Sequence, residues 1–193
     1  MPIFEEHPLK PFLPRNAKVL LLGSFPPQQK RWSMDFYYPN YQNDMWRIMG
    51  MLFFADRNVF VDSANKRFKK EEICQFAEEV GIALYDTAEA VRRLKDNASD
   101  SHLEIVRPTR IEELLEQLPS CKAIVATGEK AAGEIVQQYG VLKPQIGGSV
   151  PIQFGQRNLQ FYRMPSTSRA YPLAIDKKAV SYHAMFSELG MLW

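Results

Sequence analysis

Aromatic and amide side chains alternate in the segment Phe36-Tyr-Tyr-Pro-Asn-Tyr-Gln-Asn-Asp-Met-Trp46, which follows a short turn, Gly23-Ser-Phe-Pro-Pro27. An aromatic ring can stack on a planar nucleobase, and an amide can recognise the edge of that base through hydrogen bonds. Stacking of this kind contributes about 1–3 kcal/mol per base. The pattern is therefore typical of a base-binding pocket, although an aromatic-rich core loop uses the same residue types.

The reactive side chains give little indication of metal binding, phosphate binding or nucleophilic catalysis. The histidines His7, His102 and His183 show no ligand spacing with each other or with Cys74 and Cys121, and two isolated cysteines cannot complete a zinc or iron–sulfur site. The chain contains no GxxxxGK[ST] phosphate loop, no GxGxxG after a strand, no GxSxG and no HExxH. We therefore expect neither a metal nor a cofactor.

The composition places few limits on the partner. A net charge of +2 over 193 residues does not by itself indicate a nucleic-acid-binding protein, but local basic clusters such as Lys177-Lys178 could bind phosphate groups. No apolar stretch approaches 18 residues, and no basic segment precedes an apolar run. We expect a soluble, cytoplasmic monomer with no membrane segment.

The elements that must position these residues follow from the pattern of apolar side chains. Continuous apolar runs bounded by turn residues are typical of parallel strands that are buried on both faces. Apolar residues three and four positions apart indicate helices between these runs. Strands that alternate with helices predict a three-layer α/β/α sandwich with a central, mostly parallel four-stranded sheet. The predicted strands are Val19–Leu22, Ile82–Leu84, Ile124–Ala126 and Leu159–Arg163.

Two loops should meet at one edge of that sheet. Sheets of this kind bind ligands outside the carboxyl ends of their strands. The loop Gly23–Gln42 follows the first predicted strand, and the loop Pro165–Pro172 follows the last. Residues 86–107 predict a loop with a helical turn. The proline-rich residues 1–17 predict an extended arm that lies on a single domain of residues 18–193.

Both loops resemble motifs of a known family. Gly23-Ser-Phe-Pro-Pro27 with Tyr37-Tyr-Pro-Asn-Tyr-Gln-Asn-Asp-Met-Trp46 is similar to the first motif of two branches of the uracil-DNA glycosylase superfamily. These are the mismatch-specific uracil/thymine and the hypoxanthine-DNA glycosylases, whose motif is Gly-x-x-Pro-Gly followed by Tyr-Tyr-x-His-Pro-x-Asn-x-Phe-Trp. Met164-Pro-Ser-Thr-Ser-Arg-Ala-Tyr171 resembles the second motif. The resemblance implies the fold of that superfamily.

Two segments between these motifs extend the similarity. Gly81-Ile-Ala-Leu-Tyr-Asp86 resembles the hypoxanthine-type segment Gly-Ile-x-Leu-Trp-Asp. Ile124–Ala132 matches a strand–Asn-Gly-Lys–helix segment, with Thr127 in place of the Asn. The four segments occur in one order, and the similarity runs from about Lys18 to Leu192.

The first motif also departs from the family pattern. Phe25 stands where the mismatch-uracil enzymes have the Asn that directs water, and phenylalanine has no polar atom for that task. Some hypoxanthine-type members share an apolar residue there and rely on the Asn of the second half-motif, which corresponds to Asn43. Asn40-Tyr41 replaces the His-Pro pair, and Pro27 replaces the terminal Gly.

The resemblance implies a role for each matching residue. Asn43 would orient the attacking water or contact the base, unless it only caps the helix that follows. Tyr38 would stack on the flipped base, in a pocket completed by Ser24, Phe25 and Asn40. The expected DNA contacts are Ser166 at a phosphate (unless it only supports its turn), Arg169 and Tyr171 in the space that the base leaves, and Thr167, Ser168, Lys177 and Lys178 around them.

The implied reaction is hydrolysis of an N-glycosidic bond in DNA that carries a damaged or mismatched base. Extruding a base costs a few kcal/mol and is easiest for a mispaired base, which favours lesions. Hypoxanthine, uracil or a related deamination product fits, and Phe25 argues against robust uracil excision. The alternatives are a non-catalytic DNA- or nucleotide-binding protein with the same fold and, more distantly, an enzyme that acts on a free nucleotide.

Overall fold

The computed structural model describes residues 4–94 and 102–192 and contains a central five-stranded sheet. Its strands run in the order β5 (Ile82–Asp86), β2 (Val19–Gly23), β8 (Ala123–Thr127), β10 (Arg157–Met164) and β9 (Ser149–Phe154). The first four are parallel, and β9 pairs antiparallel with β10 at one edge. The predicted four parallel strands are therefore confirmed, and a hairpin adds the fifth.

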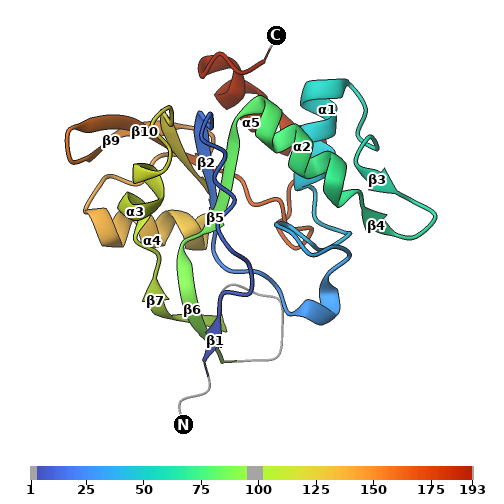
Figure 1. Ribbon diagram of the computed structural model, residues 1–193, viewed down its shortest axis with the longest axis horizontal. Helices are drawn as coiled ribbons and strands as arrows, with labels where there is room; N and C mark the ends of the chain where they lie inside the picture. Colours follow the sequence, from blue (N-terminus) through green and yellow to red (C-terminus); the bar gives the residue numbers. More distant parts are fainter. Residues whose placement is uncertain (1–3, 95–101, 193) are drawn as a thin grey trace.

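The composition of three of the parallel strands follows from their burial. Every residue of β2, β5 and β8 is buried. Because helices cover both faces, such strands use continuous apolar runs in place of an alternating pattern. Figure 1 shows the layers, with α1 (Met45–Phe54), α2 (Lys70–Val80) and α5 (Ile175–Glu188) on one side and α3 (Ile111–Glu116) and α4 (Glu129–Tyr139) on the other. The predicted α/β/α arrangement is confirmed.

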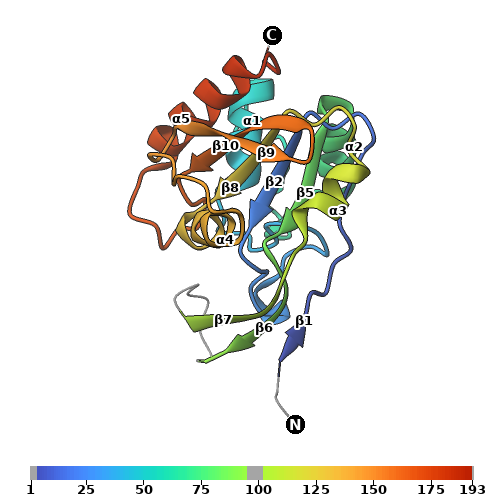
Figure 2. The ribbon, with the colours of Figure 1, turned by 90° about the vertical axis from the view of Figure 1, so that its left-hand side faces the viewer.

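A smaller antiparallel sheet lies beyond the carboxyl ends of β2 and β5, as Figures 1 and 2 both show. Its strands are β1 (Glu5–Glu6), β6 (Ala88–Arg93) and β7 (Leu103–Pro108), in the order β1-β6-β7. The predicted loop with a helical turn over residues 86–107 is therefore wrong for the described part, and residues 95–101 lie outside it. Strands form here because Ala88, Val91 and Leu103 pack against Phe25, a contact that local periodicity does not reveal.

The residues that precede β2 run along the small sheet and the edge of the central sheet. β1 pairs with β6, and the amide of His7 donates a hydrogen bond of 2.8 Å to the Glu89 carbonyl. Further along, the amides of Phe12 and Leu84 each donate to the other's carbonyl, at 3.0 and 2.9 Å. We call residues 4–17 the arm. These bonds attach the arm to both sheets.

Two short elements complete the chain. A hairpin of β3 (Val61–Asp62) and β4 (Arg67–Phe68) joins α1 to α2, and a 3-10 turn, η1 (Gln29–Arg31), lies within the loop after β2. Among residues 4–94 and 102–192, no helix combines the length and the apolar character that a membrane crossing needs.

Candidate active site

Three neighbouring strands end at the same place. Gly23, Asp86 and Thr127 are the last residues of β2, β5 and β8, and Gly23 and Asp86 are partners in the sheet register. The loops after β2 and β10 meet beside them, where the amide of Asp44 donates to the Thr167 carbonyl at 2.9 Å. This is the edge at which parallel sheets bind ligands.

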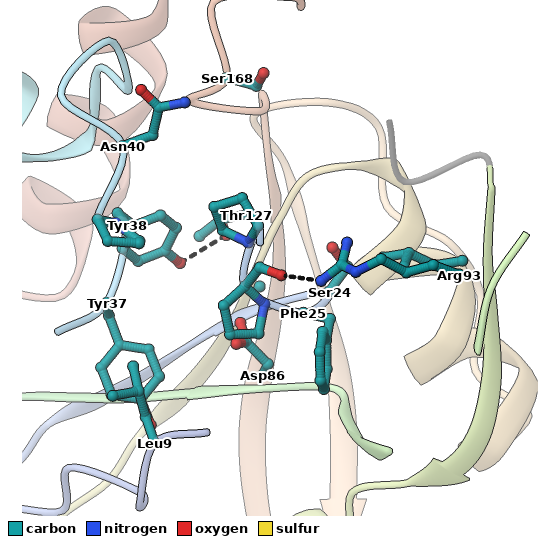
Figure 3. Close-up of a pocket in the computed structure, with 15 residues that line it drawn as sticks. Leu9, Ser24, Phe25, Tyr37, Tyr38, Asn40, Asp86, Arg93, Thr127 and Ser168 are labelled. Atoms are coloured by element: carbon teal, nitrogen blue, oxygen red, sulfur yellow. Dashed lines mark hydrogen bonds between the residues drawn. The ribbon is translucent and has the colours of Figure 1, made fainter. Parts of the chain in front are cut away.

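A cavity of about 130 Å³ opens at this edge, and Figure 3 shows the side chains that surround it. Its wall combines the loop after β2, the ends of β5 and β8, the small sheet, Leu9 of the arm and Ser168 of the loop after β10. Pockets for drug-sized ligands occupy roughly 300–1,000 Å³, so this cavity suits a single small group.

Aromatic rings form two sides of the cavity. Phe25 and Tyr37 are buried, and Tyr38 is half-buried. A hydrogen bond of 2.8 Å joins Tyr38 Oη to Thr127 Oγ1 and fixes the tyrosine ring (Figure 3). The backbone of Tyr38 has a φ of +51°, in the left-handed region. Such a conformation costs a non-glycine residue on the order of 1–3 kcal/mol and concentrates at functional sites.

Both tyrosine hydroxyls stay neutral at physiological pH. Desolvation raises the pKa of Tyr37 and of Tyr38 far above the ordinary value, and the negative charge of Asp86 raises both further. The hydrogen bond with Thr127 lowers the pKa of Tyr38 but is the smallest of these influences. The two hydroxyls therefore serve as hydrogen-bonding groups and not as bases.

A carboxylate lies at the floor of the cavity. The Asp86 side chain is 9% exposed, and Nε2 of His7 donates to its Oδ2 at 2.8 Å. Thr109 Oγ1 donates to the Asp86 carbonyl at 2.7 Å and holds the backbone. A Cβ atom on residue 23 would lie only 2.4 Å from Asp86 Oδ1, so the carboxylate needs glycine at Gly23 to hold this position.

Arg93, a cationic side chain in the cavity wall, is already paired. Its Nε donates to the Glu5 carboxylate at 2.9 Å, and its Nη2 donates to the Pro26 carbonyl at 2.7 Å, as Figure 3 shows for the second bond. The guanidinium also lies 5.7 Å from the centre of the Phe25 ring. Arg93 therefore supports the Phe25-Pro26 turn from the small sheet.

Four residues predicted for the base pocket line the cavity, namely Ser24, Phe25, Tyr38 and Asn40. Ser168, predicted as a DNA contact, lines it too, and Figure 3 shows Asn40 and Ser168 at the same rim.

Asn43 lies outside the lining of this cavity. Its Oδ1 accepts a hydrogen bond of 2.9 Å from the Met45 amide, and its carbonyl accepts one of 3.1 Å from the Arg47 guanidinium. An amide oxygen that receives the backbone N–H of a first turn acts as a helix cap. Asn43 precedes Asp44, the N-cap residue of α1, whose own side chain makes no capping hydrogen bond, so the Asn43 amide makes the contact with the start of the helix that was its structural alternative.

The other residues of the second motif also lie outside the cavity lining. Ser166 lies against Gly128, because a Cβ on residue 128 would be 3.5 Å from the Ser166 Cβ, and Ser166 Oγ accepts from the Ser168 amide at 3.2 Å. Arg169 Nε donates to Asp44 Oδ1 at 2.9 Å. The remaining positions are Thr167, which is buried, Tyr171, which is half-buried, and Lys177, which is exposed on α5.

The expectation that Lys178 contacts DNA is wrong. Its side chain is buried, and Nζ donates to Asp44 Oδ2 at 2.9 Å and to the Ser168 carbonyl at 2.8 Å. A buried ammonium group requires a charge partner and further hydrogen bonds, and Lys178 finds both inside the protein. It therefore ties α5 to the loop after β10 and is not available to DNA.

Sequence reasoning assigned no role to His7, Asp86, Arg93 or Thr127. Asp86 and Thr127 each lie just after a predicted strand, and the meeting of carboxyl ends in a parallel sheet could have placed both beside Gly23. His7 offered no local signal, because its partner lies 79 positions away. Within the described residues, no group of three or more His, Cys, Asp or Glu side chains could hold a metal ion.

The fold is similar to that of a solved protein. The solution NMR structure of "a putative Uracil DNA glycosylase" from Methanosarcina acetivorans matches with a TM-score of 0.63 and 20% sequence identity, over 97% of this chain and 99% of that chain. No protein-family model matches the sequence, and no curated protein does. At this level of identity the likeness shows a shared fold alone, and that fold agrees with the α/β/α sandwich that the sequence predicted.

Proposed function

We propose that the chain is a DNA glycosylase of base excision repair, which hydrolyses the N-glycosidic bond of a deaminated or mismatched base such as hypoxanthine or uracil. The proposal is carried by the small cavity in which aromatic rings and a carboxylate converge, at the ligand-binding edge of a glycosylase-like fold. An enzyme of this kind extrudes the base and reads it inside such a pocket. The partner is DNA that carries the lesion.

The cavity offers separate surfaces for the faces and the edge of a base. Tyr38 and Phe25 supply rings on which a base can stack. Among the described residues, Asp86 Oδ1 has no hydrogen-bond partner, and an ionised carboxylate is an acceptor only. The cavity therefore favours a base that presents a ring N–H to Asp86, as hypoxanthine and uracil do.

Hydrolysis adds one water across the glycosidic bond: its hydroxyl bonds to C1′, and its proton goes to the released base. The sugar gains positive charge as the bond breaks, and a nearby carboxylate can stabilise that charge or hold the water. We assign this role first to Asp86, because Oδ1 has two lone pairs and can accept from both the base N–H and the water. Asn43 is the candidate that the resemblance implies, but its Oδ1 would have to share the water with the Met45 amide.

The loop after β10 and the start of α5 supply the proposed DNA contacts. Ser168 stands at the rim of the cavity, the Arg169 side chain is 52% exposed, and Lys177 is exposed. Ser168 borders the opening through which a flipped base would enter, and Arg169 follows it directly in the chain. Ser166 and Tyr171 stay in the proposed contact set, and Thr167 contributes through the backbone that its burial holds in place.

A panel of oligonucleotides tests the proposal. Single- and double-stranded substrates with one uracil, hypoxanthine, xanthine or mismatched thymine are incubated with the protein, and abasic sites are detected by alkaline strand cleavage. We expect release from at least one lesion and none from the undamaged control. Binding measured at several salt concentrations should weaken with a log–log slope of about −0.9 per phosphate contacted.

The second candidate function is a DNA- or nucleotide-binding protein without glycosylase activity, and Phe25 favours it. The Phe25 ring is 7% exposed and packs edge-on against His7, with 5.2 Å between ring centres, so it directs no polar atom into the cavity. Salt-dependent binding of a lesion duplex with no base release from any substrate would support this second function.

A further inference from the structure

The buried ring of His7 is a chemically active group that the proposed function has not yet used. Its side chain is 2% exposed, although it comes from the arm and not from the central sheet. Nε2 donates to Asp86 Oδ2 at 2.8 Å. The arm therefore contributes a polar contact to the floor of the cavity.

Groups other than Asp86 fix the direction of the His7 ring. Nδ1 lies 3.1 Å from the amide nitrogen and 2.9 Å from the carbonyl oxygen of Leu9, so the Leu9 backbone can donate to a neutral ring or accept from a protonated one. The ring centre lies 4.6 Å from that of Tyr85 and 5.2 Å from that of Phe25. These contacts hold the imidazole in place independently of Asp86, so the ring can in turn fix the Asp86 carboxylate.

The two oxygens of Asp86 are in different situations. Oδ2 receives the hydrogen bond from His7, while Oδ1 lies over Gly23 in space that a side chain at that position would fill. A Cβ atom built on residue 23 would lie 2.4 Å from Asp86 Oδ1 and 3.8 Å from Thr127 Oγ1, so both groups border the same space at the end of β2. Without the bond at Oδ2, rotation about the Cβ–Cγ bond of Asp86 would be less restricted, and the acceptor would lose its fixed direction.

We propose that His7 is a positioning residue for Asp86, which it orients so that Oδ1 presents one directed acceptor to the N–H edge of the bound base. This inference rests on the proposed function. It also makes the arm part of the base-recognition apparatus. The pairing of β1 with β6 and the ion pair between Glu5 and Arg93 determine where His7 lies.

Two substitutions at His7 separate its hydrogen bond from its packing. His7→Phe keeps a ring but removes the donor, and His7→Gln keeps an N–H donor. Glu6→Gln is the matched control, because Glu6 belongs to the same arm but pairs with Arg107 outside the cavity lining. Each variant is made in the wild-type and in the Asp86→Asn background, and single-turnover base release, duplex affinity and Tm are measured.

We expect His7→Phe to lower base release by about 10–100-fold, the loss that removing the hydrogen-bond partner of a metal-binding side chain typically causes. His7→Gln should recover a large part of that loss, and Glu6→Gln should leave release unchanged. In the Asp86→Asn background His7→Phe should change release by less than about threefold, because coupled residues give non-additive effects.

Equal losses in both backgrounds, or a Gln variant no better than the Phe variant, would show that His7 only packs and would overturn the positioning role. The Tm reveals whether His7→Phe folds. If it does not, base release is compared between His7→Gln alone and His7→Gln combined with Asp86→Asn. Non-additive losses of release support the positioning role, and additive losses overturn it. Wild-type protein that releases no base from any substrate overturns the proposed function and this inference together, and the wild-type assay distinguishes that failure from the first.

Discussion

Two buried aspartates, Asp86 and Asp44, hold basic side chains from distant parts of the chain, yet their surroundings differ. Asp44 has both carboxylate oxygens paired, Oδ1 with Arg169 and Oδ2 with Lys178, each at 2.9 Å. Asp86 has Oδ2 paired with His7, no described residue pairs with Oδ1, and the residue lines the cavity. A carboxylate with both oxygens paired joins elements of the fold, and one with an oxygen still available can bind a ligand.

Burial and charge alone would not separate these two residues. The Asp44 side chain is 4% exposed and that of Asp86 is 9% exposed. What differs is the number of acceptor positions that the protein itself occupies. The partners of Asp44 also come from the loop after β10 and from α5, so this aspartate locks both to the start of α1. Asp44 therefore joins elements of the fold, and Asp86 is the aspartate that we propose to bind the base.

The largest effect should come from Asp44→Asn. The substitution leaves the Lys178 ammonium buried without a charge partner, and breaking a buried pair in this way costs about 3–5 kcal/mol of unfolding free energy. Urea denaturation measures that loss. Adding Lys178→Met should restore much of it, because the uncompensated charge disappears as well. If Asp44→Asn alone kept the wild-type unfolding free energy, Asp44 would not have the structural role described above.

Asp86→Asn should affect activity more than folding. We expect single-turnover base release to fall by about 10²–10³-fold, or roughly 2.7–4 kcal/mol, the contribution of one well-placed polar group. An amide oxygen can still accept the hydrogen bond from His7, so the unfolding free energy should change less than in Asp44→Asn. Release at the wild-type rate would show that Asp86 is not the acceptor that the reaction uses.

Asn43→Ala should have the smallest effect. Loss of a helix cap costs about 1 kcal/mol of unfolding free energy, and we expect base release to stay within about threefold of the wild-type rate. Thermal denaturation and single-turnover release on the same preparation measure both quantities. A fall in release of 10²–10³-fold without unfolding would instead support the water-orienting role that the motif resemblance implies.

The parts of the fold that sequence reasoning predicted are encoded locally. β2, β5 and β8 are uninterrupted apolar runs, and such runs mark strands buried on both faces wherever their neighbours lie. The small sheet was not predicted because the apolar residues of β6 and β7 pack against Phe25, which lies more than sixty positions before β6. Its strands depend on tertiary packing and not on local periodicity.

The candidate site likewise combines residues that the local sequence indicates with residues that only long-range contacts bring together. Ser24, Phe25, Tyr38 and Asn40 were predicted to line the base pocket from one loop whose composition is visible in the sequence, and that loop does line the cavity. Lys178 was misplaced because neighbouring lysines are usually solvated, whereas its partner Asp44 lies 134 positions away. Long-range pairs of this kind leave no signal in the spacing of either residue.

The attachment of the arm has a consequence for how the native protein fluctuates. β1 spans two residues at the edge of the small sheet, whereas β2 is a buried interior strand of the larger one. Segments with few buried contacts open locally at a lower free energy than the core does, so the amide hydrogens of β1 should exchange with solvent sooner than those of β2. Each opening would withdraw His7 from Asp86 while the central sheet stays intact. The apparent affinity for a base would then scale with the fraction of molecules whose arm is seated, as it does whenever only part of an ensemble is competent to bind.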